Sequence, residues 1–180
     1  ALKTDGSVVA WGNSGYGGDA SAVQSNLTNV TTIYSTSNNF AALKTDGSIV
    51  SWGTYWTGSE NTLLVTPGGL SNVQSIYSNS NAFAALKTDG SVVTWGSPSD
   101  GGNPSAEVQN DLTNVTTIFA NKNVFAALKT DGSLVTWGLS GRGDDTSNVD
   151  VTNISAVVYS NYYHNGSYFT HDRGTVQTLT

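Results

Sequence analysis

The chain has 180 residues, a formal net charge of -6 and only 11% charged side chains. With seven Lys and Arg in all, it lacks the basic surface that binds nucleic acid or an anionic membrane, so we expect neither as a partner. The sequence holds no Cys, which excludes disulfides and thiolate chemistry, and no apolar run long enough to cross a membrane. At this length the chain suits one domain with a substantial core, and we expect a single repeat domain over residues 1–180.

The chain opens with a phrase that returns along its whole length. Residues 1–12 read Ala-Leu-Lys-Thr-Asp-Gly-Ser, three mostly apolar residues and Trp-Gly. The phrase recurs at 42–53, 85–96 and 127–138, and a worn copy occupies 168–180. Its turn glycines lie about 42 residues apart: Gly6, Gly47, Gly90 and Gly132. Such a period predicts one supersecondary unit per repeat, each burying its faces against its neighbours.

Each phrase predicts a β-hairpin, because Asp-Gly between two apolar runs favours a two-residue type I′ turn. Such a turn would place Leu43 opposite Val50 and Ala41 opposite Trp52. Both faces of the hairpin are then apolar, so we expect it to lie between other sheets. The repeated tryptophans are expected to be core anchors between repeats rather than a platform for sugars: Trp11, Trp52, Trp95 and Trp137.

The segments between the hairpins complete a unit of about four strands. A Gly-, Pro- and Asn-rich loop follows each Trp-Gly, as at 13–19 and 97–102. A short run comes next, at 21–24 or 106–109, which we expect to be a strand or an extended edge. Strict alternation at 30–34, and again one and two repeats later, predicts the last strand. No stretch shows a helical period.

Four short strands per repeat of this length are typical of a β-propeller blade. The hairpin phrase at 83–96, with the Gly-rich loop and the strand ending in Ile-Tyr or Ile-Phe, resembles the repeat of the regulator of chromosome condensation family, especially its bacterial relatives. The resemblance implies an all-β propeller of about four blades with a degenerate fifth hairpin. The chain departs from the family in its shorter repeats, its few blades and the loss of Trp-Gly from the last one. We carry over neither nucleotide exchange nor chromatin binding.

The first repeat begins within the phrase, without the Asn-Phe-Ala lead-in found at 39–41, so we expect a piece or processed form of a longer chain. An extra hairpin ends the chain. The two ends suit closure of a ring within one chain, strand exchange between chains into a fibre, or a segment of a longer array. These three alternatives stay open from the sequence.

Residues that depart from the repeat are the candidates for binding. Tyr55 and Trp56 lie in the loop of the second phrase, and Tyr162 and Tyr163 lie in the atypical tail. Each pair fits a protein or carbohydrate contact, or a structural cap. Arg142 and Asp144 flank a glycine in the tripeptide used by many integrin ligands, a match that chance also produces.

Other signals of chemistry are weak. Asn-X-Ser/Thr acceptors matter only if the source glycosylates secreted proteins, and they occur at Asn26, Asn29, Asn114, Asn153 and Asn165. The two histidines, His164 and His171, lie in the tail without a positioned nucleophile, and no acidic ladder of a calcium loop is present. We therefore expect no catalytic residue, no metal and no cofactor.

These features together predict a non-enzymatic extracellular or cell-surface protein with a structural or adhesive role. It would be a building block of a surface array or filament, or a protein-interaction scaffold. Its partner would be a protein, including a further copy of itself, or a surface glycan. The alternatives are a carbohydrate-binding lectin that uses the loop aromatics and an intracellular regulatory propeller scaffold.

Overall fold

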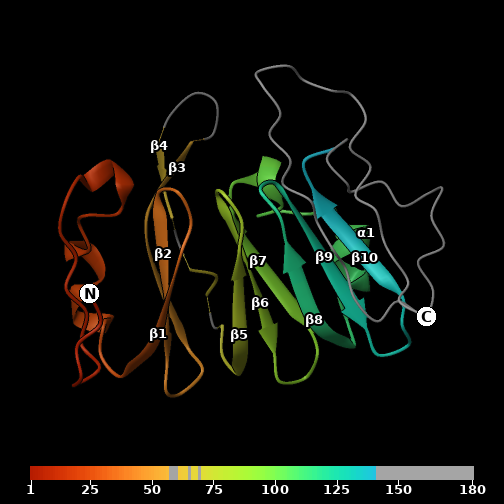
Figure 1. Ribbon diagram of the computed structural model, residues 1–180, viewed down its shortest axis with the longest axis horizontal. Helices are drawn as coiled ribbons and strands as arrows, with labels where there is room; N and C mark the ends of the chain where they lie inside the picture. Colours follow the sequence, from red (N-terminus) through yellow and green to blue (C-terminus); the bar gives the residue numbers. More distant parts are fainter. Residues whose placement is uncertain (57–60, 65, 69, 141–180) are drawn as a thin grey trace.

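The computed structural model describes residues 1–56, 61–64, 66–68 and 70–140, which form antiparallel sheets standing side by side in a row (Figure 1). The first sheet has the order β1-β2-β3-β4, the second β5-β6-β7 and the third β10-β9-β8. The strands are β1 (Val30–Ser35), β2 (Asn39–Lys44), β3 (Ile49–Trp56), β4 (Asn61–Leu63), β5 (Val73–Ser78), β6 (Ala82–Lys87), β7 (Val92–Gly96), β8 (Val115–Ala120), β9 (Val124–Lys129) and β10 (Leu134–Gly138).

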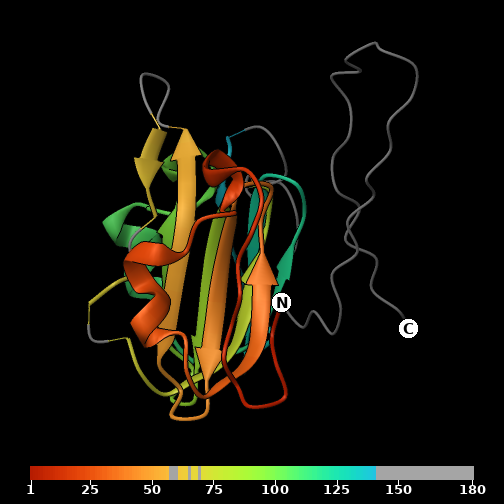
Figure 2. The ribbon, with the colours of Figure 1, turned by 90° about the vertical axis from the view of Figure 1, so that its left-hand side faces the viewer.

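Each sheet is built from one alternating strand and the hairpin that follows it, as the repeat predicts. The N-terminal hairpin, residues 1–12, lacks the preceding strand and holds a single β-bridge, between Leu2 and Val8. It lies at the end of the row, beside the first sheet (Figures 1 and 2). The all-β, blade-like repeat fold is thereby confirmed for the described part of the chain. The worn hairpin at 168–180 lies outside the described residues.

The predicted hairpin register is wrong by one residue. Phe40, not Ala41, lies opposite Trp52, and Leu43 lies opposite Ile49. The turn holds three residues, with the Gly47 amide donating to the Lys44 carbonyl at 3.0 Å. Within it only Gly47 has positive φ, whereas a type I′ turn requires two such residues. A type I turn followed by a left-handed glycine satisfies Asp-Gly equally well.

The turn glycine is also the contact with the next sheet. The φ of Gly47 is +74°, and a Cβ there would lie 3.2 Å from the amide nitrogens of Asn72 and Val73. Its carbonyl accepts a hydrogen bond from the Val73 amide at 3.1 Å. Glycine tolerates both the left-handed backbone and the close approach, and the turns of Gly6, Gly47 and Gly90 each close onto the start of the next sheet.

The two faces of each sheet belong to different cores. In the first sheet, Ala41, Leu43 and Ile49 share one buried cluster with the facing side of the second sheet. The opposite face shares another cluster with the N-terminal hairpin and the segment after it. The second and third sheets repeat the arrangement. The expectation that both faces are covered is therefore confirmed for the first and second sheets, and the described cores lie between neighbouring sheets.

The short runs expected to be extended are helical. A 3-10 helix, η2, spans Ser21–Asn26, and α1 spans Ala106–Asp111; two further 3-10 turns are η1 (Ser14–Tyr16) and η3 (Pro98–Asp100). At α1, the Ser105 hydroxyl accepts the Val108 amide as an N-cap. The Gln109 side chain then donates to the carbonyl of Val92 at 2.9 Å, which satisfies the free edge of β7. None of the described helices is long and apolar enough to cross a membrane.

Candidate functional site

The first sheet carries a hairpin where its neighbours carry a glycine loop. β3 continues past its Trp-Gly, and Tyr55 pairs with Thr62 while Trp56 pairs with Asn61 of β4. The described parts of β3 and β4 lie at the upper end of the first sheet (Figures 1 and 2). The sequence interpretation of 54–56 as loop is thus wrong, because Thr, Tyr and Trp favour strand over turn. The backbone of Tyr55 and Trp56 belongs to this β3–β4 hairpin.

The neighbouring loops have no room for such an insertion. A Cβ on Gly18 would lie 2.4 Å from the Gly12 carbonyl carbon, and one on Gly102 would lie 2.5 Å from that of Gly96. These paired glycines therefore fold the loop tightly back on its strand. The first sheet lacks the pair, and this leaves the position open to the hairpin.

The tryptophan contact between neighbouring sheets is kept where the hairpin replaces the glycine loop. The Trp137 indole nitrogen donates to the Gly101 carbonyl of the preceding loop at 3.1 Å. Trp95, which faces the exchanged loop, donates instead to the Ser51 hydroxyl at 3.0 Å. At the base of the hairpin, Thr54 donates to the Gly15 carbonyl at 3.0 Å. The hairpin is therefore added without loss of the tryptophan anchor.

A buried polar residue sits at the base of the same hairpin. Asn39 pairs with Gly53 and is fully buried, yet its side-chain amide has no hydrogen-bond partner among the described residues. The corresponding residues of the next sheets are the apolar Ala82 and Val124. An unpaired buried amide costs about 1–3 kcal/mol. Among the described residues, the hairpin and the unpaired Asn39 amide thus lie together in the first sheet, and local violations of this kind are typical of functional sites.

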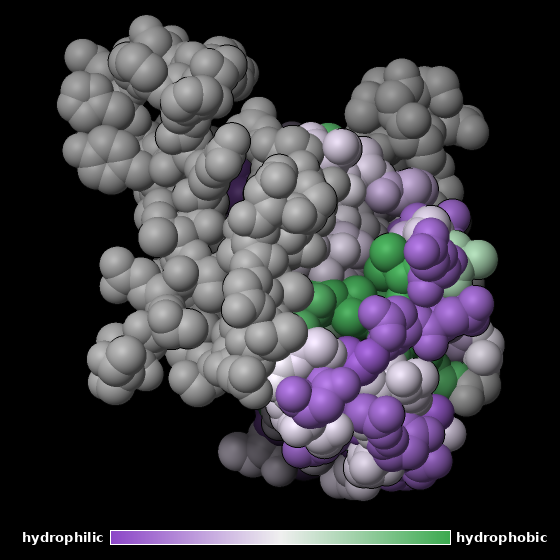
Figure 3. All heavy atoms as spheres, turned by 90° about the vertical axis from the view of Figure 1, so that its right-hand side faces the viewer, coloured by the Kyte–Doolittle hydropathy of each residue, from purple (hydrophilic) through white to green (hydrophobic). Residues whose placement is uncertain are grey.

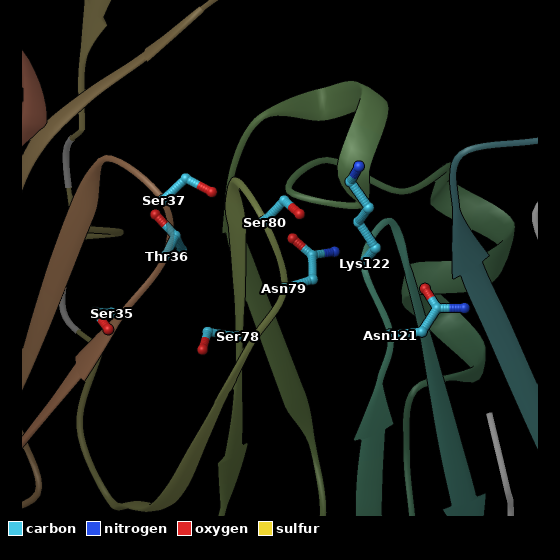
Figure 4. Close-up of a pocket in the computed structure, with 8 residues that line it drawn as sticks. All are labelled: Ser35, Thr36, Ser37, Ser78, Asn79, Ser80, Asn121 and Lys122. Atoms are coloured by element: carbon cyan, nitrogen blue, oxygen red, sulfur yellow. The ribbon is translucent and has the colours of Figure 1, made fainter. Parts of the chain in front are cut away.

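A second candidate is a polar groove of about 530 Å³ along the turns that join the first two strands of each sheet (Figure 4). Its walls come from consecutive sheets, whose turns are linked by main-chain hydrogen bonds. The Ser37 amide donates to the Ser80 carbonyl at 2.9 Å, and the Ser80 amide donates to the Lys122 carbonyl at 3.1 Å. The lining residues are Ser35, Thr36, Ser37, Ser78, Asn79, Ser80, Asn121 and Lys122.

The groove is held rigid from behind. Asn79 accepts the Ala82 amide at 2.8 Å and donates to the main-chain carbonyl of Asp100 at 2.6 Å. The buried Asp100 carboxylate accepts the side-chain amides of Asn81, at 3.2 Å, and Asn123, at 2.7 Å. This carboxylate joins the turns of the second and third sheets. The Asn79 and Asn121 side chains hold the turns through their own backbone hydrogen bonds, so the groups that the groove offers to a peptide or a sugar are mainly its serine hydroxyls.

The described residues hold no group of three or more His, Cys, Asp or Glu side chains that could bind a metal ion. The exposed carboxylates of the Asp-Gly turns accept hydrogen bonds from the serine that follows in the same turn. The pKa of Asp89 is lowered to about 2, first by the Ser91 hydroxyl and then by the Ser91 amide, both of which donate to it. Asp5, Asp46 and Asp131 have lowered pKa values for the same reason.

Among the predicted anchors, Trp52, Trp95 and Trp137 are buried, whereas Trp11 is 70% exposed. No described sheet lies on the outer side of the hairpin that carries it. The sequons Asn26, Asn29 and Asn114 are exposed. Six other candidate residues lie outside the described part of the chain: Arg142, Asp144, Asn153, Tyr162, Tyr163 and Asn165. The groove was missed because its residues look like ordinary turn formers in each repeat.

Comparison with solved structures assigns the fold. Yeast RCC1 (Prp20), solved bound to Kap60, matches with a TM-score of 0.51 and 19% identity over 73% of this chain. The fold is an RCC1-like β-propeller repeat fold. Only 37% of the yeast protein's length is covered, so this chain spans little more than a third of it. No protein-family model and no curated protein matches the sequence.

Two further structures are similar at lower scores. The Saccharomyces cerevisiae protein Prp20p, described with its binding to Gsp1p and histones, matches at a TM-score of 0.46 and 21% identity, over 63% of this chain and 32% of its own. The CRINKLY WD40 ectodomain of the Arabidopsis thaliana receptor kinase ACR4 matches at 0.42 and 18%, over 61% and 36%.

Proposed function

We propose that this chain is a non-enzymatic scaffold that binds a protein through the β3–β4 hairpin, and that it works as a structural or adhesive protein outside the cell or on its surface. The observation that carries the proposal is the exchange of one glycine loop for the β3–β4 hairpin while the contact between sheets is kept. A rigid scaffold with one altered loop is how repeat folds gain a binding site. The yeast protein of the same fold is solved with a protein bound, which supports a protein partner.

Composition supports the extracellular part of the proposal. Few charged residues and a surface rich in Ser, Thr and Asn suit a protein outside the cell, and the exposed sequons are compatible with that location. Antibody labelling of intact and permeabilised cells of the source tests it. Labelling of intact cells is expected, whereas labelling only after permeabilisation would favour the intracellular regulatory scaffold.

Photo-crosslinking tests the binding site. A photoreactive amino acid at position 56 on the protein is expected to capture one specific protein from the source's surface fraction, and the same group at position 25 gives the matched control because Ser25 is exposed on η2, in another part of the surface. Purified partner should then lose about tenfold or more in affinity for Trp56→Ala. Equal capture from both positions, or unchanged affinity, would contradict a site at the hairpin.

Carbohydrate binding is the second candidate, and the groove of Figure 4 favours it. Hydroxyl groups that recur across consecutive sheets match the hydrogen-bonding needs of a sugar chain. A glycan array read with wild type, Asn121→Ala and Trp56→Ala separates the candidates. A glycan signal of the wild type that is lost in either variant would support a lectin. An array without any glycan signal would leave protein binding as the one remaining proposal.

A further inference from the structure

The Asp-Gly pairs of this chain are among the dipeptides most prone to rearrange spontaneously in water. They occupy residues 5–6, 46–47, 89–90, 100–101 and 131–132. The glycine amide nitrogen attacks the aspartate carboxyl carbon, because no side chain on glycine hinders the approach. The new N–C bond closes a cyclic imide, and the carboxyl OH leaves with the amide proton as water. A second water opens the imide at either carbonyl, and one product carries the main chain through the aspartate side chain as isoaspartate.

Four of these pairs lie in hairpin turns. Figure 1 draws the turns that join β2 to β3, β6 to β7 and β9 to β10 at the lower ends of the sheets, and hydrophilic residues gather on the lower part of the described surface in Figure 3. Asp46, Asp89 and Asp131 are exposed to solvent, whereas Asp100 of the fifth pair is buried. Burial therefore does not protect the pairs in the turns.

The fold needs the glycine of each turn, and it also engages the amide nitrogen that would attack. The φ of Gly90 is +79°, and a Cβ there would lie 3.3 Å from the Cα of Asn114 in the next sheet. The Gly90 amide donates to the Lys87 carbonyl at 3.0 Å, while its carbonyl accepts the Val115 amide at 2.9 Å. Closure of the imide ring must break the first of these hydrogen bonds and move a residue that the second one holds.

The serine after each of these turn glycines holds the carboxyl group that would be attacked. The Ser91 hydroxyl donates to Oδ1 of Asp89 at 2.5 Å, and the Ser91 amide donates to the same oxygen at 3.0 Å. The other three turns repeat both contacts, at 2.6 Å from the hydroxyl and 2.9 Å from the amide, between Ser7 and Asp5, Ser48 and Asp46, and Ser133 and Asp131. Both donors orient the carboxylate and stabilise its ionised form.

We propose that the serine hydroxyl in each turn protects the Asp-Gly pair from conversion to isoaspartate, so that the repeat keeps a reactive dipeptide that its sheets require. The neutral acid is the reacting form, because an ionised carboxylate has no OH group to lose. The Ser91 hydroxyl is the largest cause of the lowered pKa of Asp89, about 2, which makes the neutral acid rarer at neutral pH. The pKa values of Asp46 and Asp131 are lowered by the same contact.

Peptide mapping by mass spectrometry after prolonged incubation at neutral pH tests the inference. Trypsin cleaves after lysine, so Asp46, Asp89 and Asp131 fall in separate peptides and isoaspartate is measured in each turn. Ser91→Ala is expected to raise the rate at Asp89 at least about tenfold and to leave the other two rates unchanged. Ser133→Ala should raise only the rate at Asp131, so each variant is the control for the other. Ser91→Thr keeps a hydroxyl and should form isoaspartate as slowly as wild type.

Three results would overturn the inference. The first is an unchanged rate at Asp89 in Ser91→Ala with a native circular dichroism spectrum. The second is an equal rise at all three turns, because protection would then belong to the fold as a whole and not to the serine. The third needs no variant: folded wild type that forms isoaspartate as fast as the same chain unfolded in urea would show that the turns give no protection.

Discussion

Replacing Trp95 by alanine should destabilise the fold far more than the same replacement at Trp11. Trp95 is 4% exposed, stacks on Phe83 with centroids 5.2 Å apart and donates to the Ser51 hydroxyl. An indole buries roughly 150–250 Å², worth about 4–6 kcal/mol at ~25 cal/mol per Å². Large-to-small replacements of buried aromatics cost about 3–5 kcal/mol. We expect a loss of about 4 kcal/mol in the free energy of unfolding.

Trp11→Ala is the matched control, because residue type and repeat position are the same and only the covering neighbour is missing. With its ring 70% exposed, the expected change is within about 0.5 kcal/mol. Urea unfolding, followed by far-ultraviolet circular dichroism at a concentration where the chain is monomeric, measures both values. Equal losses at the two positions would refute the reasoning that a neighbouring repeat, rather than the residue itself, makes the tryptophan an anchor.

Four further changes test individual contacts by the same unfolding assay. Gly47→Ala should cost about 1–2 kcal/mol, because Gly47 has a left-handed backbone and the next sheet approaches it closely. The control, Gly68→Ala, should be near neutral because no atom lies close to that position. Equal effects of the two replacements would contradict the close contact at Gly47. Asp100→Ala should cost about 1–2 kcal/mol by leaving two partly buried side-chain amides, of Asn81 and Asn123, without their acceptor, and no loss would refute its bridging role. Asn39→Ala should stabilise by about 1 kcal/mol, since the buried amide lacks a partner among the described residues; destabilisation would show that it has one. The pKa of Asp89 falls from 3.8 to about 2 on folding, so its contribution to the free energy of unfolding is present above pH 3.8 and is lost as the pH falls toward 2. Wild type should therefore lose more stability than Asp89→Asn over that pH interval. Parallel curves of stability against pH for the two proteins would contradict this.

The repeat period and the apolar alternation predicted the sheets and their order, because each unit buries its faces only against the next. The register of the hairpins could not be read from the same residues. Asp-Gly fits both a two-residue and a three-residue turn, and a shift of one residue exchanges the two faces. The choice follows from Gly47, which has positive φ and meets the following sheet, a contact distant in sequence.

The helices escaped prediction for a different reason. Runs of six residues are too short to show a helical period, and their stability comes from contacts made at their ends. Gln24 and Gln109 each donate to a strand carbonyl, of Val8 and Val92, and a buried leucine follows each run. The recurring Val-Gln pair followed by Leu was the available signal for these helices. It could be recognised only with the hairpin carbonyl in view to which each Gln side chain donates.

The candidate site was predicted in part. Tyr55 and Trp56 stood out because the other repeats lack them, and the structure places their backbone in β3, paired with β4. The groove was invisible in sequence, since it arises only when the turns of several sheets align. Trp11 illustrates the opposite limit: its repeat position predicts a buried anchor, but burial depends on a neighbour that the described chain does not supply.

Indole hydrogen exchange, measured by nuclear magnetic resonance, tests the central claim most directly. Each sheet contacts the preceding unit through one buried tryptophan. The indole nitrogens of Trp52, Trp95 and Trp137 donate to the Gly17 carbonyl, the Ser51 hydroxyl and the Gly101 carbonyl, respectively. In the monomeric chain these indole protons should exchange slowly, and that of Trp11 should exchange rapidly. Rapid exchange at all four, or protection of Trp11 equal to the others, would contradict the stacked arrangement.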